Sequence, residues 1–157
     1  SDPVNPLSAY GRTKLAGEQA TAETNPRHHI VRTSWLFGPG GPNFVETILR
    51  LAAERNELRV VDDQVGKPTF TGHLAPALLE LAASEDYGVH HRAGGGQCSW
   101  FEFAREIVER VGADCRVEPC TSAEFPRPAP RPAYSVLAGG ELPSWQQGLE
   151  EYLGVRV

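Results

Sequence analysis

The sequence contains no methionine and only three cysteines, and both shortages narrow the classes of protein to which it can belong. Cys98, Cys115 and Cys120 form no CxxC pair and are odd in number, so we expect buried or idle thiols and not a disulfide framework. Such sparse cysteine is typical of the reducing cytosol, and we therefore expect a cytoplasmic protein.

Long apolar runs and an excess of basic residues are also missing. No stretch reaches the roughly 18 apolar residues of a membrane-spanning helix, so we expect no membrane partner. Residues 1–6 lack the basic and apolar regions of a signal peptide, and a start without methionine is typical of the middle of a longer chain. The formal charge of −5 argues against a general nucleic-acid binder.

What is present fits one compact α/β unit. The 157 residues are 40% hydrophobic, as in ordinary globular domains. Periodicity and caps predict helices over 8–23, 43–52, 74–83, 100–111 and 143–153, and strands over 29–33, 35–37, 58–61 and 88–91. The other segments read as a polar loop over 62–72, a flexible turn over 94–96 and a surface loop or extended linker over 118–131. No strand precedes the first helix, so we expect an incomplete doubly wound sheet.

Tyr10 and Lys14 form the first candidate for chemistry. A spacing of four places both side chains on one face of the predicted helix. An ammonium stabilises a phenolate, so this pair could protonate a carbonyl oxygen while a hydride arrives at carbon. Taken alone, the same spacing is also typical of an ordinary solvated pair, and both interpretations stay open at this point.

Three further groups of polar or aromatic residues are candidates for binding. Thr33, Ser34 and Trp35 end a predicted strand, where ligands gather in open α/β sheets, although Trp35 could equally belong to the core. Asn43 begins a helix whose free amides could hold an anion, or it is simply the cap. The polar loop 63–69 lies between a strand and a helix, as binding loops often do.

The histidines do not predict a metal site. They occur as the adjacent pairs His28-His29 and His90-His91, and neighbours on a strand point to opposite faces. No carboxylate or cysteine stands at ligand spacing beside them, so we expect no metal.

Read together, these segments resemble the dTDP-4-dehydrorhamnose reductase family of extended short-chain dehydrogenases. The matching stretches, in order, are residues 5–18, 32–38, 43–45, 58–66, 68–71, 98–104, 131–137 and 142–145. The resemblance covers nearly the whole chain, and so many co-linear blocks favour the catalytic interpretation of Tyr10 and Lys14. It implies the C-terminal part of a Rossmann-type NAD(P)-binding fold plus a small α/β sugar-nucleotide domain, with the N-terminal βαβ units missing. Residues 1–42 would then hold the catalytic helix and last Rossmann elements, and residues 43–157 mainly the substrate domain.

The resemblance also implies an activity and a set of site residues. The family reduces the 4-keto group of dTDP-4-dehydro-L-rhamnose with NADPH or NADH. Tyr10 would donate the proton, and Lys14 would assist it and hold the nicotinamide ribose. Thr33 and Ser34 would join them in contacting the cofactor. The residues implied for the sugar-nucleotide cleft are Trp35, Asn43, Phe44, Gln64, Thr69 and Arg131, with Arg131 favoured for the diphosphate because its planar fork matches phosphate oxygens.

The sequence departs from the family pattern at several points. No glycine-rich strand–turn–helix and no upstream Ser or Thr of the catalytic trio precede Tyr10. Gly94 stands where asparagine is usual, which we expect to loosen the loop before Cys98, and His73 replaces an aspartate that would cap the helix at Leu74. A non-catalytic sugar-nucleotide-binding or regulatory relative therefore stays open as an alternative, and so does a homodimer.

Overall fold

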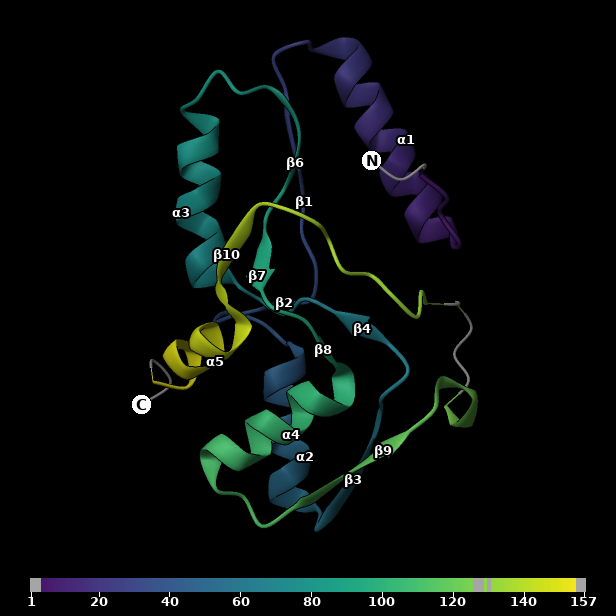
Figure 1. The fold of residues 1–157 in the computed structure, drawn as a ribbon, viewed down its shortest axis with the longest axis vertical. Helices are drawn as coiled ribbons and strands as arrows, with labels where there is room; N and C mark the ends of the chain where they lie inside the picture. Colours follow the sequence, from purple (N-terminus) through teal and green to yellow (C-terminus); the bar gives the residue numbers. More distant parts are fainter. Residues whose placement is uncertain (1–3, 126–128, 130, 155–157) are drawn as a thin grey trace.

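Short strands and helices alternate along the chain in the computed structural model, which describes residues 4–125, 129 and 131–154 (Figure 1). The helices are α1 (Ala9–Thr24), α2 (Phe44–Glu54), α3 (Thr71–Ala82), α4 (Trp100–Val111), α5 (Trp145–Gly154) and the 3-10 helix η1 (Ser122–Glu124). The strands are β1 (His29–Arg32), β2 (Leu36–Phe37), β3 (Glu57–Val61), β4 (Val65–Gly66), β5 (Thr69–Phe70), β6 (Gly88–His91), β7 (Ala93–Gly95), β8 (Cys98–Ser99), β9 (Arg116–Cys120) and β10 (Glu141–Ser144).

The described strands pair two by two, mostly in parallel. The parallel pairs are β1 with β6, β2 with β5, β3 with β9, and β7 with β10, whereas β4 and β8 run antiparallel. Parallel pairing requires crossover connections, and helices provide most of them here. The expected α/β class is confirmed.

Helices α1 and α3 flank the β1–β6 pair in the upper part of Figure 1. Helix α1 buries none of its residues, and a two-pronged ion pair ties it to β1: Arg32 donates to Glu18 at 2.9 and 2.5 Å. Strand β6 comes from the range assigned to the substrate domain, yet it pairs with β1 from the range assigned to the Rossmann elements. The division at residue 42 stays a prediction.

The main core lies in the lower part of Figure 1, where α2 and α4 pack beside the β3–β9 pair. Spacings of three and four residues bury one face of each helix, with Val45 and Ile48 on α2 and Phe103 and Ile107 on α4. The Phe37 ring of β2 packs at a tilt against Phe103, with centroids 5.5 Å apart, and is 1% exposed. This core fixes the starts of α2 and α4 relative to each other.

Local capping signals are confirmed at three helices. Ser8 and Asn43 accept backbone N–H bonds at the starts of α1 and α2. Ser99 forms a complete capping box with Glu102 at the start of α4. Gly112 ends α4 with a φ of 62°, a left-handed conformation that glycine adopts without strain.

The prediction of a polar loop over residues 62–72 is wrong. The segment contains β4 and β5, and residues 66–70 are all buried. The charged residue Lys67 favours a surface loop in the sequence. In the structure it is 3% exposed, and its ammonium pairs with Glu141 at 2.5 Å. A tertiary ion pair satisfies the charge, so a polar composition does not place this segment at the surface.

Two further predictions are also wrong: the flexible turn at Gly94–Gly96 and the start of α3. Gly94 lies in buried strand β7, where a Cβ would fall 2.1 Å from the carbonyl oxygen of Pro68, so it tightens the packing instead of loosening a loop. Helix α3 begins at Thr71, and His73 therefore lies inside its first turn and not at the cap. Pro76 consequently lies in the second turn, where it removes one helical hydrogen bond.

The segment expected to be a loop over 118–131 is partly regular. Strand β9 extends to Cys120, and η1 follows it, while residues 126–128 and 130 lie outside the described residues. The three cysteines are free and buried, as expected, and burial raises the pKa of each thiol.

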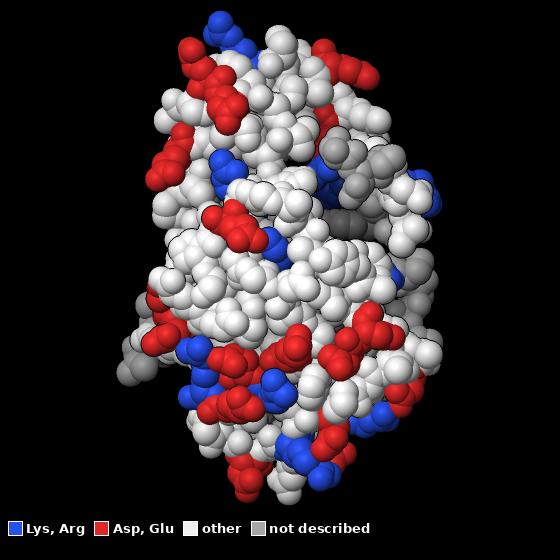
Figure 2. Space-filling view, in the orientation of Figure 1, with Lys and Arg blue, Asp and Glu red and all other residues white. Residues whose placement is uncertain are grey.

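On the surface seen in Figure 2, acidic and basic side chains lie side by side around the lower part of the molecule. Several of them pair along or between elements, such as Arg110 with Glu106 at 2.7 Å. Among the described residues, no helix is both long and apolar enough to cross a bilayer.

Candidate functional site

A cavity of about 740 Å³ opens between α2, β3, η1 and the segment at Arg131. It is mainly apolar with a few polar groups, the usual character of a small-molecule site. Its described lining residues are Phe44, Thr47, Ile48, Leu51, Arg59, Val60, Val61, Gln64, Trp100, Ser122, Ala123, Phe125, Ala129 and Arg131.

Two aromatic side chains form the inner wall of this cavity. Phe44 and Trp100 are the first residues of α2 and α4, so the caps Asn43 and Ser99 determine where both rings stand. The ring centroids lie 4.5 Å apart at an angle of 49°. At this distance the two rings contact each other, so together they form one apolar wall of the cavity.

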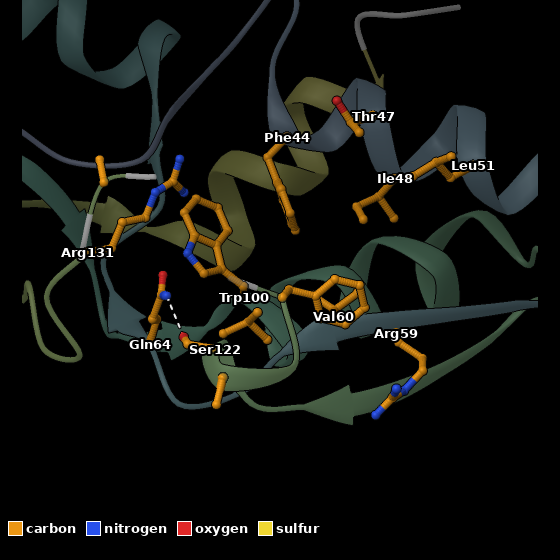
Figure 3. Close-up of a pocket in the computed structure, with 14 residues that line it drawn as sticks. Phe44, Thr47, Ile48, Leu51, Arg59, Val60, Gln64, Trp100, Ser122 and Arg131 are labelled. Atoms are coloured by element: carbon orange, nitrogen blue, oxygen red, sulfur yellow. Dashed lines mark hydrogen bonds between the residues drawn. The ribbon is translucent and has the colours of Figure 1, made fainter. Parts of the chain in front are cut away.

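Polar groups lie at both ends of the cavity, and Figure 3 shows Arg131 and Gln64 beside Trp100 at one end and Arg59 at the other. Gln64 donates to the hydroxyl of Ser122 at 2.7 Å. Asp63 accepts from the side chain and the backbone of Ser122, and these hydrogen bonds lower the pKa of Asp63. These hydrogen bonds hold the segment that follows β3 against the start of η1.

The two cations that line the cavity differ in their partners. Arg59 pairs with Glu124, whose pKa falls to about 2 because the Thr121 backbone and then Arg59 donate hydrogen bonds to it. Arg131 is exposed and has no carboxylate within ion-pair distance among the described residues. Arg131 is thus the cation of this cavity that is available to an anionic ligand.

Tyr10 and Lys14 lie outside the cavity, on α1. The Lys14 ammonium lies 5.6 Å from the centroid of the Tyr10 ring, so the spacing of four brings the two side chains together as expected. Tyr10 is 72% exposed, and its hydroxyl is free to meet a ligand. A smaller cavity of about 250 Å³ lies beside Lys14, between α1 and Arg32.

Thr33, Ser34 and Trp35 follow β1 and differ in what they contact. The hydroxyl oxygen of Thr33 is buried and has no hydrogen-bond partner among the described residues. Ser34 donates to the carbonyl oxygen of Lys67 at 2.8 Å. Trp35 stacks on Trp100 with centroids 3.5 Å apart and planes 8° apart, so it lies directly behind the wall of the large cavity.

Asn43 and Thr69 do not line the cavity, and their side chains are engaged elsewhere. Asn43 caps α2 and donates to the carbonyl oxygen of Gly38 at 3.0 Å. Thr69 is fully buried, and its hydroxyl accepts the N–H of Gly94 at 3.0 Å. Both shape the framework around the site, and their direct contact with a ligand stays a prediction.

Of the residues proposed from the sequence, the structure brings Phe44, Gln64 and Arg131 into one cavity. Sequence reasoning missed Trp100, Ser122 and Phe125 as lining residues. The cap at Ser99 marks where Trp100 stands on its helix, but nothing in the sequence shows that this helix start meets that of α2.

Comparison with known proteins gives consistent matches over almost the whole chain. Residues 1–155 match the RmlD substrate binding domain family. The spore coat polysaccharide biosynthesis protein SpsK of Bacillus subtilis is 44% identical over 99% of this chain and 57% of its own length. A dTDP-4-dehydrorhamnose reductase of Mycolicibacterium smegmatis is 45% identical over 96% of this chain and 49% of its own length.

Solved structures agree with these matches. The crystal structure of a dTDP-4-dehydrorhamnose reductase from Clostridium acetobutylicum has a TM-score of 0.95 and 47% identity over 99% of this chain and 58% of its own. The reductase of Bacillus anthracis, solved in complex with NADP, also has a TM-score of 0.95, with 38% identity and the same coverage. The chain spans about half the length of the curated relatives it matches.

Proposed function

The chain belongs to the RmlD substrate binding domain family, and from this premise we propose that it contributes to the reduction of dTDP-4-dehydro-L-rhamnose to dTDP-L-rhamnose. The observation that carries the proposal is the Tyr10–Lys14 pair, with the ammonium 5.6 Å from the exposed phenol ring. In this proposal residues 1–42 carry the reacting end and residues 43–157 mainly hold the sugar nucleotide. Free, buried cysteines suit a reducing cytoplasm, where we place the protein.

The reduction adds one hydride and one proton to a ketone. NADPH or NADH, when bound, would supply the hydride to the ketone carbon. The Tyr10 hydroxyl donates its proton to the carbonyl oxygen as negative charge develops there, and the product is an alcohol. The Lys14 ammonium stabilises the phenolate that remains and can donate to ribose hydroxyls.

The residues present fit the nicotinamide end of such a cofactor. The buried Thr33 hydroxyl lacks a partner among the described residues, and a bound amide or hydroxyl would satisfy it. Lys14 is exposed beside a small cavity, where its charge is accessible. Lys14, Thr33 and Ser34 are the residues of this chain that we propose for the nicotinamide end of the cofactor.

The large cavity fits the nucleotide part of the substrate. Phe44 and Trp100 offer apolar ring surface to a base, and Gln64 offers an amide that can donate and accept. Arg131, unpaired among the described residues, provides a cation with the fork geometry that matches a diphosphate. A dTDP-sugar would then extend from this cavity toward Trp35.

The test uses the chain joined to the part of the Mycolicibacterium smegmatis reductase that it does not match. We expect this joined enzyme to oxidise NADPH only when the 4-keto sugar nucleotide is added, and calorimetry to show dTDP binding that Arg131→Ala weakens. Binding of dTDP without any turnover would contradict the reductase proposal and favour the non-catalytic sugar-nucleotide-binding relative. Absence of both would refute the assignment of the cavity.

A further inference from the structure

Trp35 has a backbone conformation that its neighbours must maintain. Its φ is 46°, and among the described residues it is the one position other than glycine with a positive φ. A bulky side chain in the left-handed region is strained, and such strain persists only where the surroundings impose it. Strained residues concentrate at functional sites, so the contacts that hold Trp35 are informative.

The segment Gly66–Thr69 holds the backbone around Trp35 from one side. Ser34 donates to the carbonyl oxygen of Lys67 at 2.8 Å, and the N–H of Thr69 donates to the carbonyl oxygen of Trp35 at 3.1 Å. Two hydrogen bonds therefore fasten Ser34 and Trp35, which follow β1, to a segment more than 30 positions away in the sequence.

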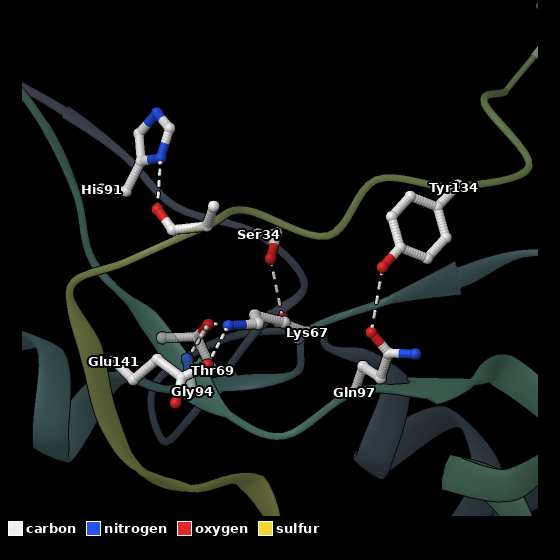
Figure 4. A network of polar contacts seen from close by, with 9 residues as sticks. Ser34, Lys67, Thr69, His91, Gly94, Gln97, Tyr134 and Glu141 are labelled. Carbon is white, nitrogen blue, oxygen red and sulfur yellow. Dashed lines mark hydrogen bonds and ion pairs between the residues drawn. The ribbon is translucent and has the colours of Figure 1, made fainter. Parts of the chain in front are cut away.

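The same segment is itself anchored. Figure 4 shows the Lys67 ammonium pointing to Glu141 and the Thr69 hydroxyl to the backbone of Gly94. The two contacts measure 2.5 and 3.0 Å, and both Lys67 and Thr69 are buried. A buried charge with a partner resists displacement, because moving it would leave the charge without compensation.

The indole of Trp35 is held by two other contacts. One is the parallel stack on Trp100, at 3.5 Å between centroids. The other is the bare backbone of Gly66, where a Cβ would fall 2.4 Å from Cε2 of Trp35. The ring therefore fits only because residue 66 has no side chain.

We propose that Gly66 and Trp100 are positioning residues, which hold the Trp35 indole in one orientation toward the sugar ring of the substrate. The inference rests on the proposed function, since Trp35 must contact the substrate for its orientation to matter. The residues of segment 66–69, which the sequence suggested as a ligand-binding loop, act through Trp35 instead. Preorganised contacts of this kind affect turnover more than they affect binding of a remote group.

Gly66→Ala is the decisive variant. The added methyl meets the far end of the Trp35 side chain, which can move, so the ring is displaced while the fold remains. Gly41→Ala is the matched control, because no atom lies within 4 Å of its Cβ position. Trp100 is less suitable as the main test because it also lines the large cavity.

The first measurement uses the chain itself. Two indoles in stacking contact couple their transitions, and when the rings are rotated relative to each other within their planes, the coupling gives a paired positive and negative band in far-ultraviolet circular dichroism. We expect this band in the unmodified chain, in Gly41→Ala and in Trp145→Phe, and we expect its loss in Trp35→Phe and Gly66→Ala. A Gly66→Ala chain that retains the band would overturn the proposal.

The second measurement uses the joined enzyme. We expect Gly66→Ala to lower kcat about 10–100-fold, the range that small misplacements cost, while the affinity for dTDP alone stays unchanged. In a Trp35→Phe background, Gly66→Ala should have no further effect, because it acts through the ring that is already gone. Independent, multiplying effects of the two substitutions would overturn the proposal.

The two hypotheses fail in different ways. If the joined enzyme does not reduce the keto sugar at all, the proposed function fails, whereas the band in the free chain still shows whether Gly66 holds the ring. If the enzyme is active but Trp35→Phe has normal kcat, the reductase proposal stands and the positioning role is refuted.

Discussion

At the scale of single residues, Tyr10 and Arg131 have different roles in the proposed reaction, and each role can be tested by one substitution. Tyr10 would lose its proton-donating group as phenylalanine while keeping its ring and its contact with Lys14. Arg131 would lose its charge as alanine without disturbing any ion pair among the described residues. Tyr10→Phe should therefore affect turnover, and Arg131→Ala should affect binding of the nucleotide.

Tyr10→Phe in the joined enzyme should lower turnover about 10²–10⁴-fold, the usual contribution of general acid catalysis. The affinity for dTDP should not change, because Tyr10 lies outside the large cavity. Steady-state kinetics and calorimetry on the same preparation check both statements. Near-normal turnover of Tyr10→Phe would remove this hydroxyl from the mechanism.

Arg131→Ala should weaken binding of dTDP by about 1.5–3 kcal/mol, the range for a hydrogen bond to a charged group. Arg131→Lys should recover only part of this loss, since lysine offers a point charge without a fork. Calorimetry on the joined enzyme measures both, with the exposed Arg55→Ala as the control of equal charge change. Equal affinity of all forms would place the diphosphate elsewhere.

At the scale of elements, helix ends and a single ion pair determine where the site residues stand. The cap at Ser99 places Trp100, and the Glu18–Arg32 pair places the helix that carries Tyr10 and Lys14. Each contact can be removed by a single substitution: Ser99 is buried at the start of α4, whereas the Glu18–Arg32 pair is partly exposed.

Ser99→Ala should lower the free energy of unfolding by about 1–2 kcal/mol, because it removes the capping box of α4. The hydroxyl also donates to Asp62 at 2.5 Å, so the loss should lie toward the upper end. Urea denaturation measures the change. Thr21→Ala serves as control, since the exposed Thr21 hydroxyl donates to the Gly17 carbonyl oxygen within its own helix; a similar loss there would contradict the capping argument.

The Glu18–Arg32 pair predicts a pH dependence of stability. The hydrogen bond from Arg32 lowers the pKa of Glu18 below its ordinary value of 4.5. The stabilisation is therefore fully present above pH 4.5 and is lost as the pH falls through the lower, folded-state pKa. Thermal unfolding between about pH 3 and pH 7 should show this acid-side loss, and Glu18→Gln should reduce it. The exposed Glu23→Gln on the same helix should not, and an equal effect of both would contradict the role of the pair.

At the scale of the whole molecule, burial is distributed unevenly. The core cluster is built from α2, α4, α5 and their neighbouring strands, while α1 buries none of its residues. Elements with few buried contacts open with little free energy.

Amide hydrogen exchange should therefore be fastest in α1 and slowest in α4. Helix α4 contributes Phe103, Ala104 and Ile107, which are all fully buried. Exchange followed by mass spectrometry on the free chain measures the order. Equal protection of α1 and α4 would contradict it and would show that α1 packs more firmly than its burial indicates. Protection of α1 that rises only in the joined enzyme would agree with the prediction.

The elements whose signals lie within a few neighbouring residues can be predicted from the sequence. Each of the helices α1, α2 and α4 is predicted from a cap, which good helix formers follow in α1 and a periodic apolar face follows in α2, and their starts at Ala9, Phe44 and Trp100 agree with the caps. The Tyr10–Lys14 pairing was likewise predicted, since a helix places residues four apart on one face whatever surrounds it. These features depend on interactions within a few residues.

The remaining features depend on contacts between distant parts of the chain. Segment 66–70 has a polar sequence and reads as a loop, but Glu141 neutralises Lys67 and the backbone of Gly94 meets Thr69, so it becomes a buried part of the framework. The large cavity likewise depends on helix starts and strand ends from distant parts of the chain. The physical reason is the same in both cases. A buried charge is stable only with a partner, and a cavity needs wall residues from several segments. The spacing of residues in the sequence identifies neither.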